Sequence, residues 1–386
     1  MRKLFHKLHL WLGLASGLLV FIIAVTGSLY AFQEEITGIG RYHYVEKRNE
    51  ALMLPTALSN VGEKIVPGKE LHAVKYNGKS KAAELIFFGY NPNYYVIAYL
   101  NPYTGEVQKV KDMNRDFFRF ILQGHYYLWL PPQIGRPLVA SSTLLFIIIL
   151  FTGIIIWIPR NRKGLKNLIW FRWKKGTRWP RINRDLHVVG GLYVTLFALI
   201  FAITGLVWGF EWFANLYYKS AGGEKSLAYT EVISYPQGRD DTLSVSEPLD
   251  KVWMLMQHEY PDAASIEVHP VHSDTASIAA NANQSDGKYW KTDYRYFNQY
   301  TLDEITTYNI YGQFKDADFA DKLMRMNYEI HTGAILGLPG KIFAFMMSLF
   351  IASLPVTGFI LWWKKRKKRS HFSEPSADRC PLNRCP

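Results

Sequence analysis

Four histidines stand at corresponding places in the two halves of this sequence of 386 residues. His9 and His187 each open a long apolar run in which a Thr-Gly pair follows seventeen residues later. His125 and His331 each precede a further apolar run that also contains a Thr-Gly pair. Neutral imidazole is the commonest side-chain metal ligand in proteins. The recurrence in register predicts two metal-ligating pairs, His9 with His187 and His125 with His331.

The elements that must position these histidines are four apolar runs, at 8–32, 137–158, 186–210 and 342–363. About 20 helical residues cross the roughly 30 Å hydrocarbon core of a bilayer, so each run predicts a transmembrane helix. The first run is longer than the core of a signal peptide, and no A-x-A-like site follows it. We therefore expect it to be a retained anchor.

Positive charge gives the expected orientation. Lysine and arginine, which bring the formal net charge to +13, gather before the first run, between the second and third, and after the fourth. Such residues mark the cytoplasmic side of spans, and lipid headgroups explain them better than nucleic acid does. We expect both termini in the cytoplasm of a bacterial cell and both long segments in the periplasm. Cys380 and Cys385, the only cysteines, then lie in a reducing compartment and predict an unstructured tail, with a metal or redox role as the alternative.

The two long outer segments resemble each other as well. The first predicts a short helix at 54–66 and strands at 82–90 and 94–100, followed by a turn at Pro102-Tyr103-Thr104-Gly105. The second predicts a helix at 245–260 and strands at 264–270, 275–282 and 294–300. Each segment is therefore expected to form a small α+β domain.

The predicted organisation is one unit used twice, as span, outer domain and span. Its boundaries are 1–35 for transmembrane helix 1, 36–118 for outer domain 1, 119–160 for an outer-face helix with transmembrane helix 2, 161–186 for a basic cytoplasmic loop, 187–214 for transmembrane helix 3, 215–328 for outer domain 2, 329–364 for an outer-face segment with transmembrane helix 4, and 365–386 for a cytoplasmic tail. Because both copies run in the same direction, we expect a pseudo-twofold axis along the membrane normal.

Two imidazoles on facing helices suit a six-coordinate haem iron, with the flat ring in a slot between them. Glycines near the first histidines could let the ring approach the backbone; they are Gly13, Gly17, Gly190 and Gly191. Nearby aromatic residues could form the walls of the slots; they are Trp11, Trp129, Tyr126 and Tyr127. For any one histidine alone, helix capping or headgroup contact is the simpler interpretation. His6 could replace His9, whereas His269 and His272 fall on opposite faces of a strand. The Thr-Gly pairs are most simply small-residue packing sites.

At these residues the chain resembles the PepSY-associated transmembrane family, whose members include inner-membrane ferrisiderophore reductases. The resemblance rests on "KLHLWLGLASGLLVFIIAVTGSLYAF", "LNPYTGEV", "RDLHVVGGLYVTLFALIFAITG" and the Thr-Gly spans that end in "WIPRNRK" and "WWKKRKK". It implies an α-helical membrane protein with two PepSY-like periplasmic domains and two b-type haems held by His9, His125, His187 and His331. Gln299 and "LDE" depart from the family's pattern at the second PepSY turn.

The resulting expectation is a haem-dependent oxidoreductase that passes single electrons across the inner membrane to periplasmic ferric siderophore and releases Fe(II) for uptake. No catalytic acid, base or nucleophile is expected, because the cofactor would do the chemistry. Two other classes stay open: a membrane-anchored PepSY regulator or inhibitor of a periplasmic protease, and a transporter for iron or a chelate.

Overall fold

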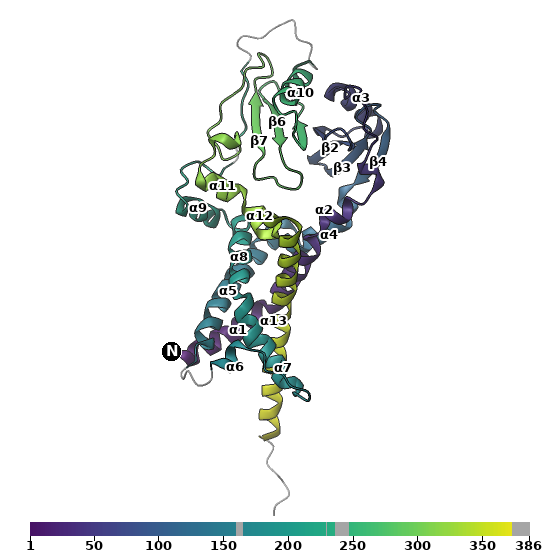
Figure 1. Cartoon of the computed structure of the whole chain (residues 1–386). Coiled ribbons are helices and arrows are strands. Elements are labelled where there is room, and N and C mark those ends of the chain that lie inside the picture. The colour runs from purple at the N-terminus through teal and green to yellow at the C-terminus, as the bar shows by residue number, and fades with distance from the viewer. Residues whose placement is uncertain (160–164, 229, 236–246, 373–386) are drawn as a thin grey trace, which may run out of the picture.

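The computed structural model describes residues 1–159, 165–228, 230–235 and 247–372. Cys380 and Cys385, with most of the expected tail, lie outside these residues. Figure 1 shows an elongated molecule with a helical bundle at one end and a β-sheet at the other. The N-terminus, the link between the second and third spans, and the C-terminal end of the last helix all lie at the bundle end that is far from the sheet (Figure 1).

Four helical segments are long and apolar enough to cross a membrane, at Arg2–Tyr30, Pro132–Trp157, Trp179–Gly209 and Ala334–Arg366. The first two are single helices, α1 (Arg2–Tyr30) and α5 (Pro132–Trp157). The third joins α7 (Trp179–Asp185), a π-helical segment η4 (Leu186–Gly190) and α8 (Gly191–Gly209). The fourth comprises η6 (Ala334–Leu336) and most of α13 (Gly337–Phe372), which continues six residues beyond Arg366 into the stretch expected to be a tail.

The spans bury alanine and aliphatic side chains between them and leave many large apolar side chains on the outside. In the bundle, α1 lies against α5 and α13, and α8 lies against the same two helices. Their core contains Val20, Ala24, Ala198 and Ala352, whereas outward-facing residues such as Leu18 are largely exposed. Burying a leucine side chain away from water is worth about 1.5–3 kcal/mol, so this outer surface requires lipid. The chain is therefore a membrane protein.

Short helices connect the bundle to the sheet. They are α2 (Gln33–Thr37), η1 (Arg41–His43), η2 (Met113–Arg115), α4 (Phe117–Tyr127), α9 (Glu211–Ser220), η5 (Phe314–Asp316), α11 (Phe319–Arg325) and α12 (Asn327–Thr332). At the opposite end of the bundle, α6 (Lys166–Ile169) follows the second span. Two of the connectors, α4 and α12, lie directly against α1 and α8 and carry the histidines of the outer pair.

The two outer segments build one antiparallel sheet of seven strands in the order β4-β3-β2-β1-β5-β6-β7. The strands of the first segment are β1 (Leu71–Tyr76), β2 (Ala83–Tyr90), β3 (Asn93–Leu100) and β4 (Val107–Asp112). Those of the second are β5 (Ser265–Val268), β6 (Ile278–Asn283) and β7 (Asp293–Phe297). The seam between the segments is the β1–β5 pair, in which Val74 lies opposite Val268 and Lys75 opposite Glu267.

One shared core holds the sheet together. Helices α3 (Pro55–Ile65) and α10 (Glu247–Glu259) pack against the same face, with Leu58, Trp253 and Met256 buried against apolar strand residues of both segments. The Trp253 ring, from the second segment, lies 4.7 Å from the Tyr76 ring of the first, centroid to centroid. The helices and strands expected in each segment are confirmed, but the two segments share one sheet and one core.

Candidate functional site

The structure brings His9 and His187 together at the end of the bundle that is far from the sheet. Their ring centroids lie 6.2 Å apart, and the ring planes cross at 76°. His9 lies in the second turn of α1, and His187 lies in the π-helical segment η4. Isolated π-helical turns inside α-helices occur often at functional sites, because the extra residue redirects a side chain.

His125 and His331 meet at the sheet end. Their ring centroids are 6.1 Å apart and the planes cross at 62°. His125 comes from α4 and His331 from α12, the two short helices that bridge the bundle and the sheet. Each pair therefore takes one histidine from each half of the chain, as the sequence predicted.

The spacing within each pair is informative. An imidazole nitrogen lies roughly 2 Å from a metal it ligates and roughly 1.2 Å from the centre of its own ring, so two axial imidazoles on one metal place their centroids about 6.3 Å apart. The observed 6.2 Å and 6.1 Å agree with this distance. A direct hydrogen bond between the two rings would bring the centroids closer, to roughly 5.2 Å, whereas edge-on ring contact covers about 4.5–7 Å and includes the observed distances.

The inner pair is held through Nδ1. His9 Nδ1 lies 3.1 Å from the carbonyl oxygen of Ile149 and 3.2 Å from Oγ1 of Thr152, both in α5. His187 Nδ1 lies 3.1 Å from the carbonyl oxygen of Leu354 and 3.1 Å from Oγ1 of Thr357, both in α13. A carbonyl oxygen only accepts, so Nδ1 carries the proton in both rings.

The outer pair repeats this arrangement. His125 Nδ1 donates to the carbonyl oxygen of Ile23 at 2.9 Å, with Thr26 Oγ1 farther away at 3.4 Å. His331 Nδ1 lies 2.8 Å from Oγ1 of Thr204. The Thr204 hydroxyl donates its proton to the carbonyl oxygen of Ile200 at 2.6 Å, so it accepts the hydrogen bond from His331.

The same tautomer therefore occurs at all four positions. With the proton on Nδ1, the lone pair is on Nε2, which is the nitrogen available to a metal. In metal-ligating histidines, the ring N–H that does not face the metal usually donates a hydrogen bond to a carbonyl oxygen or a carboxylate. This bond fixes the orientation of the ring and raises the basicity of the ligating nitrogen. Two neutral imidazoles with supported Nδ1 atoms can hold one metal ion axially, and a six-coordinate haem iron fits this donor set.

The Thr-Gly pairs have a more specific role than the packing predicted for them. Each pair receives a histidine from another helix: the threonine lies next to Nδ1, and the glycine leaves room for Cε1. A Cβ atom on Gly27 would lie 2.8 Å from Cε1 of His125, and one on Gly358 would lie 2.9 Å from Cε1 of His187. A Cβ contact below 3.0 Å is not tolerated without movement, so glycine is required for these two histidines to keep their positions.

A cavity of about 380 Å³ lies beside the outer pair. Side chains from all four spans and from α4 and α12 line it, including both histidines, Tyr126, Tyr127 and Trp208. The Trp208 ring meets the His331 ring edge-on, with centroids 5.4 Å apart. Trp208 was not among the predicted site residues, because only its position one turn after Thr204 suggests that it faces the histidine.

Several predicted slot residues lie elsewhere. Trp11 points away from the bundle and is 63% exposed, and Trp129 stacks on Phe120, outside the cavity. Gly17, Gly190 and Gly191 face side chains of α13, namely Pro355, Phe350 and Leu354. These three glycines serve helix packing, whereas Gly13 has open space within 4 Å of its Cβ position.

The remaining histidines do not join the two pairs. His6 is exposed on α1. His269 Nε2 lies 3.1 Å from a carboxylate oxygen of Glu267, whereas His272 bonds to the carbonyl oxygen of Leu71 at 2.9 Å. The two do not converge, as their spacing predicted, and the described residues contain no cluster of three or more metal-ligating side chains.

One pair lies near each end of the bundle. His9 and Thr26, which contacts the outer pair, are seventeen residues apart in α1, a rise of about 25 Å at 1.5 Å per residue. This distance is close to the roughly 30 Å of a bilayer core. The fold and the site thus define a four-span membrane protein with a sheet on one side and a histidine pair near each face.

The model of the PepSY-associated transmembrane region matches residues 6–365. The chain therefore belongs to the PepSY-associated transmembrane family, as its motifs indicated. The match includes nearly all of the four spans, the sheet and all four histidines of the two pairs. No curated protein matches the chain.

Proposed function

We propose that this protein is a haem-containing reductase that carries single electrons across the membrane to a ferric chelate on the sheet side. The observation that carries the proposal is the pair of facing imidazoles near each end of the bundle, 6.2 Å and 6.1 Å between centroids, with every Nδ1 bonded to the protein. Bound haem b would supply a one-electron change of its iron between Fe(III) and Fe(II). We expect two haems per chain, with His9, His187, His125 and His331 as the axial ligands.

The protein's own residues would orient the ligands and tune them. The carbonyl groups of Ile149, Leu354 and Ile23 keep Nε2 of three histidines directed away from their supporting helices. A histidine that donates from Nδ1 is a stronger electron donor through Nε2. Because Thr204 supports His331 with a hydroxyl at 2.8 Å, the two outer ligands have different support.

The duplicated motif supports a parallel repeat as the basis of this arrangement. Each half contributes one span with a histidine near its start and a Thr-Gly pair near its end, and then a second histidine and a second Thr-Gly span. Within each half, the histidine of the first span contacts the second span, and the histidine that precedes the second span contacts the first. A pseudo-twofold axis along the membrane normal would bring the two halves together at both pairs.

The distribution of charge supports a location in the bacterial inner membrane. The lysine- and arginine-rich ends of the spans lie at the bundle end opposite the sheet, which the positive-inside rule assigns to the cytoplasm. The sheet would then be periplasmic. Reporter fusions after Tyr44 and Gly222 should be active in the periplasm, and a fusion after Gly176 in the cytoplasm. A cytoplasmic signal from the fusion at Gly222 would contradict this orientation.

The acceptor would be Fe(III) held by a siderophore or a similar chelate on the periplasmic side. Hard oxygen donors bind Fe(III) more strongly than Fe(II), so one electron weakens the complex and frees Fe(II) for uptake. The electron donor would be a cytoplasmic or membrane partner. A protease regulator or a simple chelate transporter would need neither ligand pair.

The first test counts haem. Pyridine haemochrome analysis of the purified chain should give two haems, and His9→Ala or His187→Ala should remove one of them. His125→Ala or His331→Ala should remove the other, while His6→Ala, on the exposed face of α1, should retain both. Full haem content in all four ligand variants would contradict the axial assignment.

The second test measures transfer. Dithionite-reduced protein should be reoxidised by a ferric hydroxamate, with Fe(II) trapped by ferrozine. His331→Ala should abolish this transfer while the inner haem is still reduced. Reduced wild-type protein that transfers electrons to no ferric chelate would refute the reductase and leave electron transfer to another membrane partner.

A further inference from the structure

Among the described residues that line the cavity beside the outer histidine pair, one is charged. This residue is Arg136, in the second turn of α5. The rest of the lining is apolar, aromatic or neutral and polar, apart from the two histidines. A guanidinium group stays protonated at any physiological pH. The Arg136 side chain is exposed, so its permanent positive charge is open to a ligand in the cavity or to lipid.

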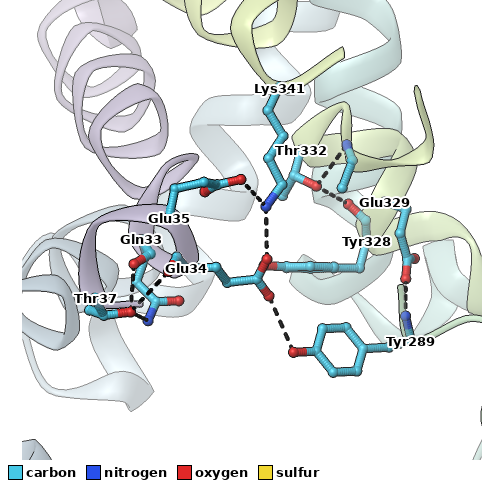
Figure 2. Close-up of polar contacts among 10 residues, drawn as sticks. Gln33, Glu34, Glu35, Thr37, Tyr289, Tyr328, Glu329, Thr332 and Lys341 are labelled. Carbon is cyan, nitrogen blue, oxygen red and sulfur yellow. Dashed lines mark hydrogen bonds and ion pairs between the residues drawn. The ribbon is translucent and has the colours of Figure 1, made fainter. Parts of the chain in front are cut away.

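The equivalent residue in the other half is Lys341. Arg136 and Lys341 each come sixteen residues before the threonine of the Thr-Gly pair in their span. Lys341 is 8% exposed, and its Nζ lies 2.7 Å from a Glu34 carboxylate oxygen and 2.9 Å from one of Glu35. Figure 2 shows both carboxylates directed at this ammonium group, with the Tyr289 hydroxyl on the other oxygen of Glu34. The charge of Lys341 is thus balanced by the protein itself.

Among the described residues, Arg136 has no ion pair like that of Lys341. Glu34 and Glu35 come eight and nine residues after Thr26, and the residues at the same distances after Thr204 are Trp212 and Phe213. In the described part of the chain, the hydrogen bonds of Arg136 go to the carbonyl oxygen of Trp208, from Nε at 3.0 Å and from Nη2 at 2.8 Å. That carbonyl is neutral, and three of the five guanidinium N–H groups remain for another acceptor.

We propose that Arg136 is the anion-binding residue of the outer cavity and pairs with a carboxylate on the edge of the bound porphyrin. The inference rests on the proposed function, because haem b carries two carboxylates on one edge of an otherwise apolar ring. Arginine presents a planar fork of donors that matches a carboxylate. The backbone carbonyl of Trp208 fixes one side of that fork, and Trp208 also contacts His331. Arg136 would therefore set which way the ring turns between its two axial ligands.

A matched pair of ligands tests this pairing: haem, and haem dimethyl ester, in which both carboxylates are esterified. The protein is the full chain with His9→Ala, which leaves only the outer site, produced in haem-limited cells and titrated in detergent by its Soret band. A charge-assisted hydrogen bond corresponds to roughly 10-fold or more in affinity. We expect Arg136→Gln to weaken haem binding by about that factor and ester binding by less than about twofold, with Arg136→Lys in between.

Arg115→Gln is the control for loss of a positive charge, since the Arg115 side chain is 89% exposed in the outer domain, and it should bind both ligands like the parent. Equal losses for haem and ester in Arg136→Gln, or no loss for either, would overturn the Arg136 inference while leaving the haem site itself in place. A change only in co-purified anionic phospholipid would also overturn it and assign Arg136 to a headgroup phosphate. A parent chain that binds neither ligand would refute the proposed function, and the inference with it.

Discussion

Replacing Thr204 by valine tests whether the hydroxyl below His331 holds that ligand in place. Valine keeps the shape of the side chain but cannot accept the Nδ1–H bond, which is 2.8 Å long in the structure. The Phe201 backbone lies near the His331 ring and can replace part of this support. We therefore expect a loss of about 1–2 kcal/mol, or roughly 5- to 30-fold in the affinity of the outer site for haem.

The same substitution at Thr26 is the matched control. Thr26 Oγ1 lies 3.4 Å from His125 Nδ1, while the carbonyl oxygen of Ile23 accepts at 2.9 Å, so the threonine adds little there. The assay is the rate of haem transfer to excess apomyoglobin from chains that also carry His9→Ala, so that only the outer haem is followed. Thr204→Val should lose haem several-fold faster than Thr26→Val. Equal rates in the two variants would refute the argument that the hydroxyl supports the ligand.

Three further predictions concern the glycines, the ion pairs of the sheet and its seam. Gly27→Ala should displace His125 and deplete one haem in the haemochrome assay, whereas Gly205→Ala, whose Cβ would lie 3.5 Å from the His331 ring, should keep both; equal haem contents would contradict the steric argument. The Arg295 guanidinium, hydrogen-bonded to Glu304, holds the pKa of that carboxyl below its ordinary 4.5 against the opposing effect of burial. The pair therefore stabilises the sheet above pH 4.5, and this stabilisation is lost as the pH falls through the lowered pKa of Glu304. Between pH 7 and 3, the melting temperature should fall less steeply for Glu304→Gln than for the wild-type protein. Parallel curves for the two proteins would contradict this role of the ion pair. Cysteines at positions 75 and 267, which are paired across β1 and β5, should form a disulfide on oxidation and shift the band on a non-reducing gel, while cysteines at 75 and 281 should not.

The histidine pairs could be predicted from the sequence because long apolar helices place residues by simple counting. Because His9 and His187 begin two spans with the same spacing to the Thr-Gly pair, the proposed parallel repeat would place them at the same depth. The role of the Thr-Gly pairs could not be predicted in the same way. Thr152 and His9 lie far apart in the chain, and a threonine next to a glycine in an apolar helix is equally typical of plain helix packing.

The direction in which single side chains point was the least predictable feature. Trp11 is two residues from His9, which is about 200° around a helix, so it faces lipid while His9 faces the bundle. The difference between Lys341 and Arg136 is present in the sequence, but it becomes visible only when Glu34 and Glu35 are seen to contact the lysine. The shared sheet was missed because each segment contains its own helix and strands, and nothing local in β1 indicates a partner in the other segment.

The β1–β5 seam has a consequence for how the protein is made. Tyr76 and Ile266 are partners in the seam but are 190 residues apart in the chain. At roughly 5–20 residues per second, β1 emerges roughly 10–40 seconds before its neighbour is synthesised. During that time two more spans must be inserted, and the open edge of β1 can pair with other chains. Assembly of the outer sheet therefore depends on completed membrane insertion. A chain whose synthesis stops after the second span would carry an incomplete sheet with an unpaired β1 edge, which is prone to aggregation and proteolysis.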